Sequence, residues 1–283
     1  WDPRNMSRAQ VDKAASTASD CDLSIVVAGE YMFRDRWTER TCGEDTDRSD
    51  ISLVGLQDEL IRKIYAAGKP VVLVLVAGRP LGVEWAAGNL DAVVNAWEPG
   101  MYGGQAIAEI LYGKVNPSAK LPVTMPRSAG QIQMIYNHKP SQYFHPYAVT
   151  PSTPLYPFGY GLSYTEYGYS DFRLDKTEIS AGEDVKAYVT VTNKGGMAGD
   201  EIVQLYIRDS FSQVTRPVKE LKDFARVHLE PGESREVEFT ITPDKLMFLD
   251  KKMRPIVEPG EFIVMVGPSS DDRDLMRLGF NVR

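Results

Sequence analysis

The first part of the chain alternates two patterns of apolar residues. In one, apolar residues fill consecutive positions, which is typical of strands buried on both faces of a parallel sheet. Such strands are predicted over Leu23–Ala28, Val71–Val76 and Ala92–Ala96. In the other, apolar residues return every three or four positions, as on one face of a helix. Helices of this kind are predicted over Ser7–Ser19, Leu53–Ala67 and Gly104–Tyr112. The alternation indicates an α/β parallel-sheet sandwich domain with crossover helices.

After about residue 165 apolar and polar residues alternate strictly, which predicts strands with one buried face. The alternating segments are Asp184–Thr192, Glu201–Ile207, Arg235–Thr242 and Glu261–Val266. About seven short strands without a cysteine pair indicate an all-β immunoglobulin-like or fibronectin-III-like sandwich, in which no helices are expected. Its core is expected to contain Val189, Val191, Val203, Leu205, Val237, Phe239, Phe262 and Val264.

Residues 126–165 join the two patterns and are rich in Pro, Gly, Tyr and Ser. The segment Tyr156–Gly161 is too aromatic for a flexible linker, and its rings are expected to pack against the α/β part. The predicted organisation is an α/β domain over residues 1–125, incomplete at its N-terminus, an ordered connection over 126–165, and a β-sandwich over 166–283. Trp1–Arg4 do not read as a signal peptide, so the chain is expected to begin inside a larger protein.

The composition argues against several classes of function. The net charge is −7 and no basic block stands out, which makes nucleic acid an unfavourable partner. No run of about 18 apolar residues is available to span a membrane. Two cysteines and three scattered histidines do not make a metal site, and no cofactor is expected. A nucleotide-binding α/β protein is disfavoured because the glycine-rich segment Gly100–Gly104 lacks a phosphate-loop lysine.

A long polar loop follows the first predicted strand and ends near Asp50. In open α/β sheets, functional groups gather beyond the carboxyl ends of the strands. Acidic residues in this region include Glu30, Glu39 and Glu44, and Trp37 lies in the middle of the loop. A carboxylate acting as general acid beside a flat aromatic ring suits a sugar. A solvated loop of ion pairs is the alternative interpretation of the same residues.

Five sequence blocks, taken in order, resemble glycoside hydrolase family 3. The four that resemble its second domain are Val71–Pro80, Trp97–Ala106, Gly113–Pro122 and Pro126–Ile132. The fifth, Leu155–Thr165, matches the family's passage into a C-terminal fibronectin-III-like domain. The order of the blocks is similar over residues 7–283, so the resemblance covers both predicted domains.

This resemblance implies the C-terminal part of a retaining, exo-acting β-glycosidase. Members of the family are chiefly β-glucosidases and β-xylosidases, which cleave terminal β-linked sugars from oligosaccharides or glycosides. Their N-terminal (β/α)8 barrel, expected as a partner of this chain, carries an aspartate nucleophile, and the second domain lends a glutamate acid/base. A β-glucosidase, periplasmic or secreted, is the first expectation, and this chain alone is expected to be inactive. The alternatives are a carbohydrate-binding or interaction module without catalysis, and a β-xylosidase or other exo-glycosidase of the same family; a homodimer is left open.

The resemblance also ranks the candidates for the acid/base. Bacterial members carry a pattern like E-x-x-x-R-x-D-(I/L)-x-(I/L), which Glu44–Leu53 fits, so Glu44 comes first. Plant-type members carry a segment like Y-T-E-T, which Trp37–Arg40 matches more weakly, so Glu39 comes second. Glu30 is third, and is expected more as a structural or sugar-contacting carboxylate. The interval from Glu30 to Glu44 is longer than usual for the bacterial pattern, which keeps Glu39 in consideration.

Two further residues, Trp37 and Arg48, are expected to bind substrate. Trp37 lies in the excess segment Arg34–Cys42 and offers a flat apolar face for stacking on a sugar. The segment would then form one wall of the outer, leaving-group subsite. Trp37 packed under the loop as an anchor is the alternative.

Overall fold

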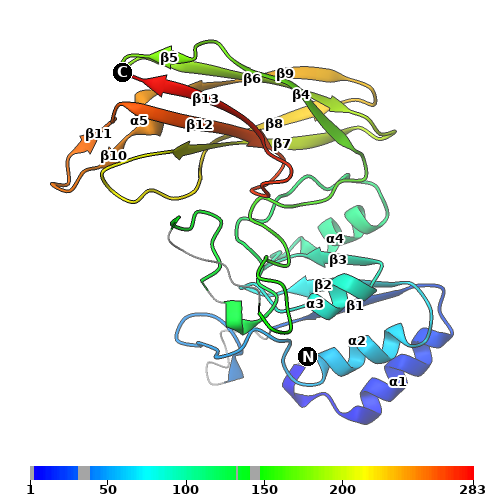
Figure 1. Cartoon of the computed structure of the whole chain (residues 1–283). Helices are drawn as coiled ribbons and strands as arrows, with labels where there is room; N and C mark the ends of the chain where they lie inside the picture. The colour runs from blue at the N-terminus through cyan, green and yellow to red at the C-terminus, as the bar shows by residue number, and fades with distance from the viewer. Residues whose placement is uncertain (1–2, 31–38, 132, 141–146) are drawn as a thin grey trace. The chain divides into compact units, whose positions relative to one another are not determined.

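The computed structural model of the chain describes residues 3–30, 39–131, 133–140 and 147–283. The chain forms two compact units, both visible in Figure 1. The first unit contains residues 1–112 and 125–133, and the second contains residues 113–124 and 134–283. The chain therefore passes between the units at residues 112–113, 124–125 and 133–134. The division into domains at residues 125 and 165 stays a prediction.

A three-stranded parallel sheet forms the centre of the first unit (Figure 1). In sheet order its strands are β1 (Ser24–Gly29), β2 (Val71–Val76) and β3 (Ala92–Asn95). The central strand β2 is covered on both faces, with Val71 and Leu73 fully buried. The three strands predicted from continuous apolar runs are confirmed to within one residue at each end.

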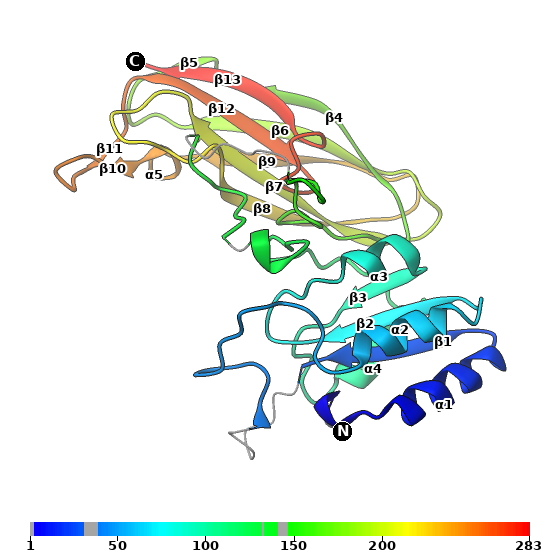
Figure 2. The same ribbon diagram turned by 60° about the horizontal axis from the view of Figure 1, so that its bottom comes forward.

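The helices described in the first unit are α1 (Arg8–Ser19), α2 (Gln57–Tyr65), α3 (Glu84–Asn89) and α4 (Gly103–Leu111), with 3-10 turns at Pro3–Asn5 and Ala129–Gln131. Helices α1 and α2 lie side by side (Figure 2). The helix predicted from Leu53 begins only at Gln57, because Gly55 has a φ of 66° and a left-handed residue cannot continue a right-handed helix. The sequence does not predict α3, since its six residues are too few for a helical period.

One face of the edge strand β1 carries exposed apolar side chains. Leu23, just before the strand, is 47 % exposed, and Ile25 and Val27 are 44 % and 57 % exposed. Val26 and Ala28 alternate with them, point to the opposite face and are buried. An exposed row of large apolar side chains is typical of a surface that another segment or molecule covers.

The second unit is a sandwich of two β-sheets (Figure 1). The five-stranded sheet has the order β5 (Glu178–Ile179), β13 (Met276–Val282), β12 (Gly260–Gly267), β7 (Gly199–Asp209) and β8 (Glu220–Leu229). The three-stranded sheet has the order β4 (Tyr167–Leu174), β6 (Val185–Asn193) and β9 (Ser234–Ile241). A separate short ribbon pairs β10 (Phe248–Leu249) with β11 (Pro255–Ile256). The predicted all-β sandwich is confirmed.

The core of the sandwich is the predicted one, since all the expected side chains are buried: Val189, Val191, Val203, Leu205, Val237, Phe239, Phe262 and Val264. The expectation that no helix follows residue 165 is wrong at one place. The single turn α5 (Pro243–Leu246) lies between β9 and β10, with Pro243 at the start, where its fixed φ suits a helix. One turn is too short for periodicity to predict.

The aromatic segment before the sandwich places the ring of Phe158 in a cluster of the second unit. The ring of Phe158 stacks on Tyr136, with centroids 4.3 Å apart, and both pack against Tyr206, Met265 and Leu275 of the second unit. The expected packing of the segment's rings against the α/β part stays a prediction, whereas the Phe158 ring lies on the outer face of the sandwich. The cause is that β7 and β12 place apolar side chains on the outer face of the five-stranded sheet as well as in the core.

Residues 113–124 are tied to the sandwich by the side chain of Asn116. Its amide donates to the Ala198 carbonyl oxygen at 3.0 Å, and its oxygen accepts from Ser163 Oγ and Tyr164 N at 2.8 Å each. Asn116 and Ala198 are 82 residues apart, so no local pattern predicts the contact. One side chain thus joins three separate segments of the second unit.

A buried ion pair adds to this attachment. Lys120 Nζ lies 3.2 Å from Glu201 Oε2 in β7, and Tyr169 donates its hydroxyl to Glu201 Oε1 at 2.8 Å. The Glu201 side chain is 3 % exposed and that of Lys120 is 13 % exposed. Burial, followed by the Glu201 charge, holds the pKa of the Tyr169 hydroxyl well above its usual range.

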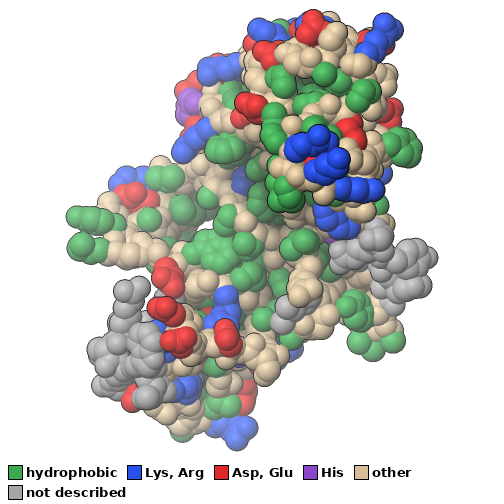
Figure 3. Space-filling view, turned by 90° about the vertical axis from the view of Figure 1, so that its left-hand side faces the viewer, with side chains coloured by type: hydrophobic (Ala, Val, Ile, Leu, Met, Phe, Trp, Pro, Cys, Tyr) green, Lys and Arg blue, Asp and Glu red, His purple; other side chains and the backbone are tan. Residues whose placement is uncertain are grey.

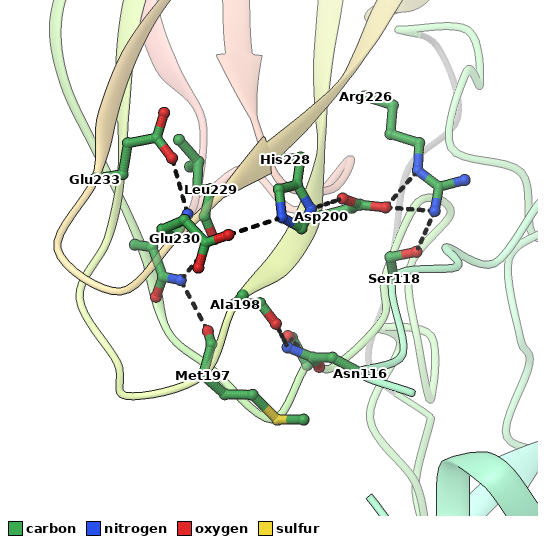
Figure 4. A network of polar contacts seen from close by, with 12 residues as sticks. Asn116, Ser118, Met197, Ala198, Asp200, Arg226, His228, Leu229, Glu230 and Glu233 are labelled. Atoms are coloured by element: carbon green, nitrogen blue, oxygen red, sulfur yellow. Dashed lines mark hydrogen bonds and ion pairs between the residues drawn. The ribbon is translucent and has the colours of Figure 1, made fainter. Parts of the chain in front are cut away.

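A second polar network reaches Ser118 across the surface of β7 and β8 (Figure 4). Asp200 lies opposite His228 in the register of these strands, and its carboxylate accepts from Arg226 Nε at 2.7 Å and contacts His228 Nδ1 at 2.6 Å. Arg226 Nη2 reaches Ser118 Oγ at 3.5 Å. Hydrogen bonding to Asp200 raises the pKa of His228. Because Arg226 and His228 are exposed, this network contributes less to stability than Asn116 does.

Replacing Asn116 with alanine should lower the free energy of unfolding of the second unit by about 2 kcal/mol, because the partly buried Ala198 carbonyl oxygen and Ser163 hydroxyl lose their partner. Urea unfolding of the chain, followed by the far-ultraviolet circular dichroism of the sandwich, measures this change. His228→Gln is the control and should leave the midpoint nearly unchanged. A midpoint for Asn116→Ala equal to that of the control would contradict the attachment described here.

Candidate functional site

The carboxyl ends of the three parallel strands meet at one edge of the sheet in the first unit. Glu30 follows β1, Arg79 follows β2 and Glu98 follows β3. Backbone hydrogen bonds continue past the strands, from Glu30 N to Val76 O at 3.0 Å and from Ala77 N to Trp97 O at 3.1 Å. This edge therefore presents polar side chains from three separate segments.

The carboxylate of Glu30 is buried beneath this edge, with its side chain 0 % exposed. Arg48 Nη1 donates to Glu30 Oε1 at 2.9 Å, and Arg79 Nε lies 3.2 Å from Oε2 as an ion pair without hydrogen-bond geometry. The buried thiol of Cys42 lies near the carboxylate. Burial first, and then the negative charge of Glu30, raise the pKa of Cys42 to about 11. Glu30 thus joins three side chains that are distant in sequence.

The backbone that carries Glu30 has little freedom. A side-chain carbon added at Gly29 would lie 1.8 Å from the Val76 carbonyl oxygen, so only glycine fits. The fully buried Gln57 accepts from Gly29 N and donates to Gly29 O, both at 2.8 Å. The carboxylate therefore leaves the sheet from a fixed position.

The arginines that hold Glu30 also bind the backbone of the following loop, residues 39–53. Arg79 Nη2 donates to Thr46 O and Arg48 Nη2 donates to Ser52 O, both at 2.9 Å. Arg40 Nη2 donates to Glu44 O at 2.7 Å. The loop backbone is thus held by arginine side chains at the carbonyl oxygens of Glu44, Thr46 and Ser52.

The side chain of Glu44 is exposed on this loop, as are those of Asp45 and Asp47. Acidic side chains gather on the part of the first unit that faces the viewer in Figure 3. Glu39 is half-buried, and its carboxylate lies 3.6 Å from Arg4 Nη2. The candidates for an acid/base therefore occupy three environments, of which only that of Glu30 is fully buried.

Of the two residues expected to bind substrate, Trp37 and Arg48, the structure describes only Arg48. Trp37 lies outside the described residues. Arg48 is 14 % exposed and directs its guanidinium to Glu30, Ser52 O and, at 3.4 Å, Asp50. The donors of Arg48 that the structure places are thus used by Glu30 and by the loop itself.

Sequence reasoning missed the parts that Gln57 and Cys42 play at this site. Gln57 had a signal, because a helical period places it on the same face as Ile61 and Ile64, which are buried. A polar residue on an apolar helix face needs an internal partner, which here is the backbone of Gly29. No pattern in the sequence pairs Cys42 with Glu30.

Within the part of the chain that the structure describes, no cluster of three or more His, Cys, Asp or Glu side chains has the arrangement to bind a metal ion. No helix among the described residues is long and apolar enough to cross a membrane.

Comparison with known proteins finds two domain models that match successive parts of the chain. Residues 4–164 match the model of the glycosyl hydrolase family 3 C-terminal domain, and residues 201–270 match that of the fibronectin type III-like domain. The chain belongs to glycosyl hydrolase family 3. The family that the sequence blocks resemble is thereby confirmed, as is the order of its two domains.

Relatives with curated names match the family 3 chain over nearly its whole length. A β-xylosidase of Formosa agariphila is 39 % identical over 99 % of this chain, and a periplasmic β-glucosidase of Salmonella typhimurium is 39 % identical over 95 % of it. The matches cover 38 % and 35 % of those proteins. The chain thus spans little more than a third of the length of these relatives and corresponds to the C-terminal part of such glycoside hydrolases.

Solved structures of family members have the same fold. A β-glucosidase from Erythrobacter marinus superimposes with a TM-score of 0.90 and 41 % identity, covering 98 % of this chain and 36 % of the other. A β-glucosidase from Listeria innocua, solved with glucose, superimposes with a TM-score of 0.88 and 32 % identity over 99 % of this chain and 39 % of the other.

The burial of Cys42 predicts its reactivity. With a pKa of about 11, only about a thousandth of the thiol is ionised at pH 8, and the side chain is 2 % exposed. Iodoacetamide at pH 8 should therefore label the partly exposed Cys21 well before Cys42, as peptide mass spectrometry would show. Labelling in urea should reach both, which serves as the control. Equal labelling rates in the native state would contradict the buried contact with Glu30.

Proposed function

We propose that this chain is the acid/base-bearing C-terminal part of a retaining, exo-acting β-glucosidase. The observation that supports it most is Glu44, an exposed carboxylate on a loop tied to the carboxyl edge of a parallel sheet. The β-glucosidases and β-xylosidases that match the chain support the reaction class. The substrate is a terminal β-linked sugar of an oligosaccharide or glycoside, and the partner is the N-terminal barrel of the same enzyme.

A retaining glycosidase uses two carboxyl groups about 5–5.5 Å apart. One attacks the anomeric carbon, while the other protonates the departing oxygen and later takes a proton from water. We assign the second role to Glu44. The nucleophile is an aspartate of the barrel, because no block of this chain resembles the family's nucleophile segment.

The environments of the three candidates favour Glu44. Glu30 is fully buried and contacts two guanidinium groups, so its carboxylate is not available to a sugar. Glu39 lies 3.6 Å from Arg4 and is kept as the second candidate. Of the three, Glu44 alone combines an exposed side chain with a loop backbone that is held at the carbonyl oxygens of Glu44 and Thr46.

The leaving-group side of the site rests on the segment Arg34–Cys42. We propose that Trp37 stacks there on the outer sugar, with an anchoring role under the loop as the alternative. Arg48 would contact substrate only through donors left over from Glu30 and Ser52. A larger increase in KM for a disaccharide than for an aryl monoglycoside in Trp37→Ala would separate stacking from anchoring.

Three further properties of the whole protein are proposed: a second candidate activity, a location and a cover for the exposed apolar row. The relatives include both β-glucosidases and β-xylosidases, so β-xylosidase is the second candidate activity. A periplasmic or secreted location is proposed because one relative is named a periplasmic enzyme. The exposed row of Leu23, Ile25 and Val27 is proposed to be covered by the rest of the enzyme, and a homodimer would be the alternative cover.

Glu44→Gln in the complete enzyme should lower kcat/KM for glycosides with poor leaving groups by about 10²–10⁴-fold, because the departing oxygen is no longer protonated. Aryl glycosides with good leaving groups should lose much less. Azide should restore their turnover, since it attacks the glycosyl-enzyme without base assistance. Glu39→Gln is the matched control. Near-normal rates in Glu44→Gln with a large loss in Glu39→Gln would transfer the role to Glu39.

The 283-residue chain alone should not hydrolyse an aryl β-glucoside at any pH, because double displacement needs a nucleophile that this chain is not expected to supply. Activity should appear when a fragment containing the barrel is added. Weak sugar affinity of the chain alone, measured by calorimetry, would agree with half a catalytic cleft, whereas strong affinity would favour a binding module. Turnover by the chain alone that Glu44→Gln abolishes would refute the proposed division of roles.

A further inference from the structure

The carboxylate of Glu30 is buried near the loop that carries Glu44 and pairs with two arginines. Its side chain is completely buried, yet the groups that surround or fix it belong to three other segments of the first unit. Arg48 and Cys42 come from the loop of residues 39–53, Arg79 follows β2, and Gln57 fixes the glycine before Glu30.

Each cation that pairs with Glu30 has a second partner in the backbone of the loop. Arg79 donates to Thr46 O, two residues after Glu44, and Arg48 donates to Ser52 O. The buried thiol of Cys42, two residues before Glu44, lies close enough to the Glu30 carboxylate and the backbone of Gly78 for both to affect its pKa. The same buried charge is therefore linked to the loop backbone at two carbonyl oxygens that follow Glu44.

We propose that Glu30 is a positioning residue for proton transfer: with Arg48 and Arg79 it holds the loop backbone so that the Glu44 carboxyl points at the departing oxygen. This inference rests on the proposed role of Glu44 as acid/base. Glu30 itself touches neither substrate nor reacting atoms. Without its charge, two guanidinium groups would face each other unneutralised, and the bonds to Thr46 O and Ser52 O would weaken.

Glu30→Gln in the complete enzyme tests the proposal, since the amide keeps the shape of the side chain and removes its charge. We expect kcat/KM for alkyl glycosides, which need full protonation of the leaving group, to fall by about 10–100-fold, because a displacement of about 1 Å is enough for such a loss. Dinitrophenyl glycosides, whose leaving group needs little protonation, should change by less than about threefold. The double variant E30Q/E44Q should be no slower than E44Q, because Glu30 acts through Glu44.

The matched control is Glu201→Gln. It removes another buried, ion-paired carboxylate, from the second unit, so it should lower the melting temperature while both classes of substrate keep their wild-type ratio. If Glu30→Gln fails to fold, Arg79→Lys replaces it. That variant keeps a cation beside Glu30, loses the bond to Thr46 O, and should show the same selective loss at smaller size.

The outcomes separate this inference from the proposed function. If Glu44→Gln itself shows no dependence on the leaving group, the assignment of the acid/base fails. If Glu44→Gln shows that dependence but Glu30→Gln and Arg79→Lys slow both substrates equally, or slow neither, the positioning role is overturned. Additive losses in the double variant would overturn it as well.

Discussion

The ion pairs of the buried Glu30 carboxylate govern the carboxyl edge of the sheet. Moving a carboxylate out of water costs several kcal/mol even after relaxation, and the cost is offset only where cations and hydrogen bonds surround it. Here Arg48 and Arg79 provide that compensation. A loop conformation that withdrew either arginine would leave a buried charge with one partner fewer. The conformation of residues 39–53 is therefore coupled to the pairing of a single side chain.

These ion pairs can form because the backbone at the end of β1 is fixed by contacts that do not involve them. Gly29 lies so close to Val76 that no side chain fits, and Gln57 binds both polar groups of its backbone. The order of dependence runs from backbone sterics, to the direction of the Glu30 side chain, to the arginines and then to the loop. The sandwich of the second unit is stabilised differently, because alternating apolar residues of its two sheets fill one core.

The parts of this chain that the sequence predicts well are those with a short period. Continuous apolar runs locate β1, β2 and β3, and alternation identifies the sandwich core, because burial in these elements is decided by neighbours along the same strand. Contacts between distant segments are not predicted. Asn116 binds Ala198, which is 82 positions away in the sequence. Phe158 packs on the sandwich, and the aromatic composition of its segment does not predict where its ring packs. At the candidate site, only the family resemblance ranks Glu44 above Glu30, and that ranking stays a prediction. The partners of Glu30 come from the structure alone.

The direction of the arginines bears on how this loop can donate a proton. Residues 44–50 contain four carboxylates and one arginine, so the sequence leaves open whether Arg48 pairs with Glu44. An arginine held against a carboxylate favours its ionised form, which opposes the role of proton donor. In the structure the Arg48 guanidinium lies against Glu30 and Asp50 instead, and Arg40 binds the carbonyl oxygen of Glu44. Glu30 thus draws positive charge beneath the loop, while the carboxylates of Glu44 and its neighbours stay on the outer surface. The same interaction that shapes the loop keeps Arg48 away from the group proposed to carry the proton.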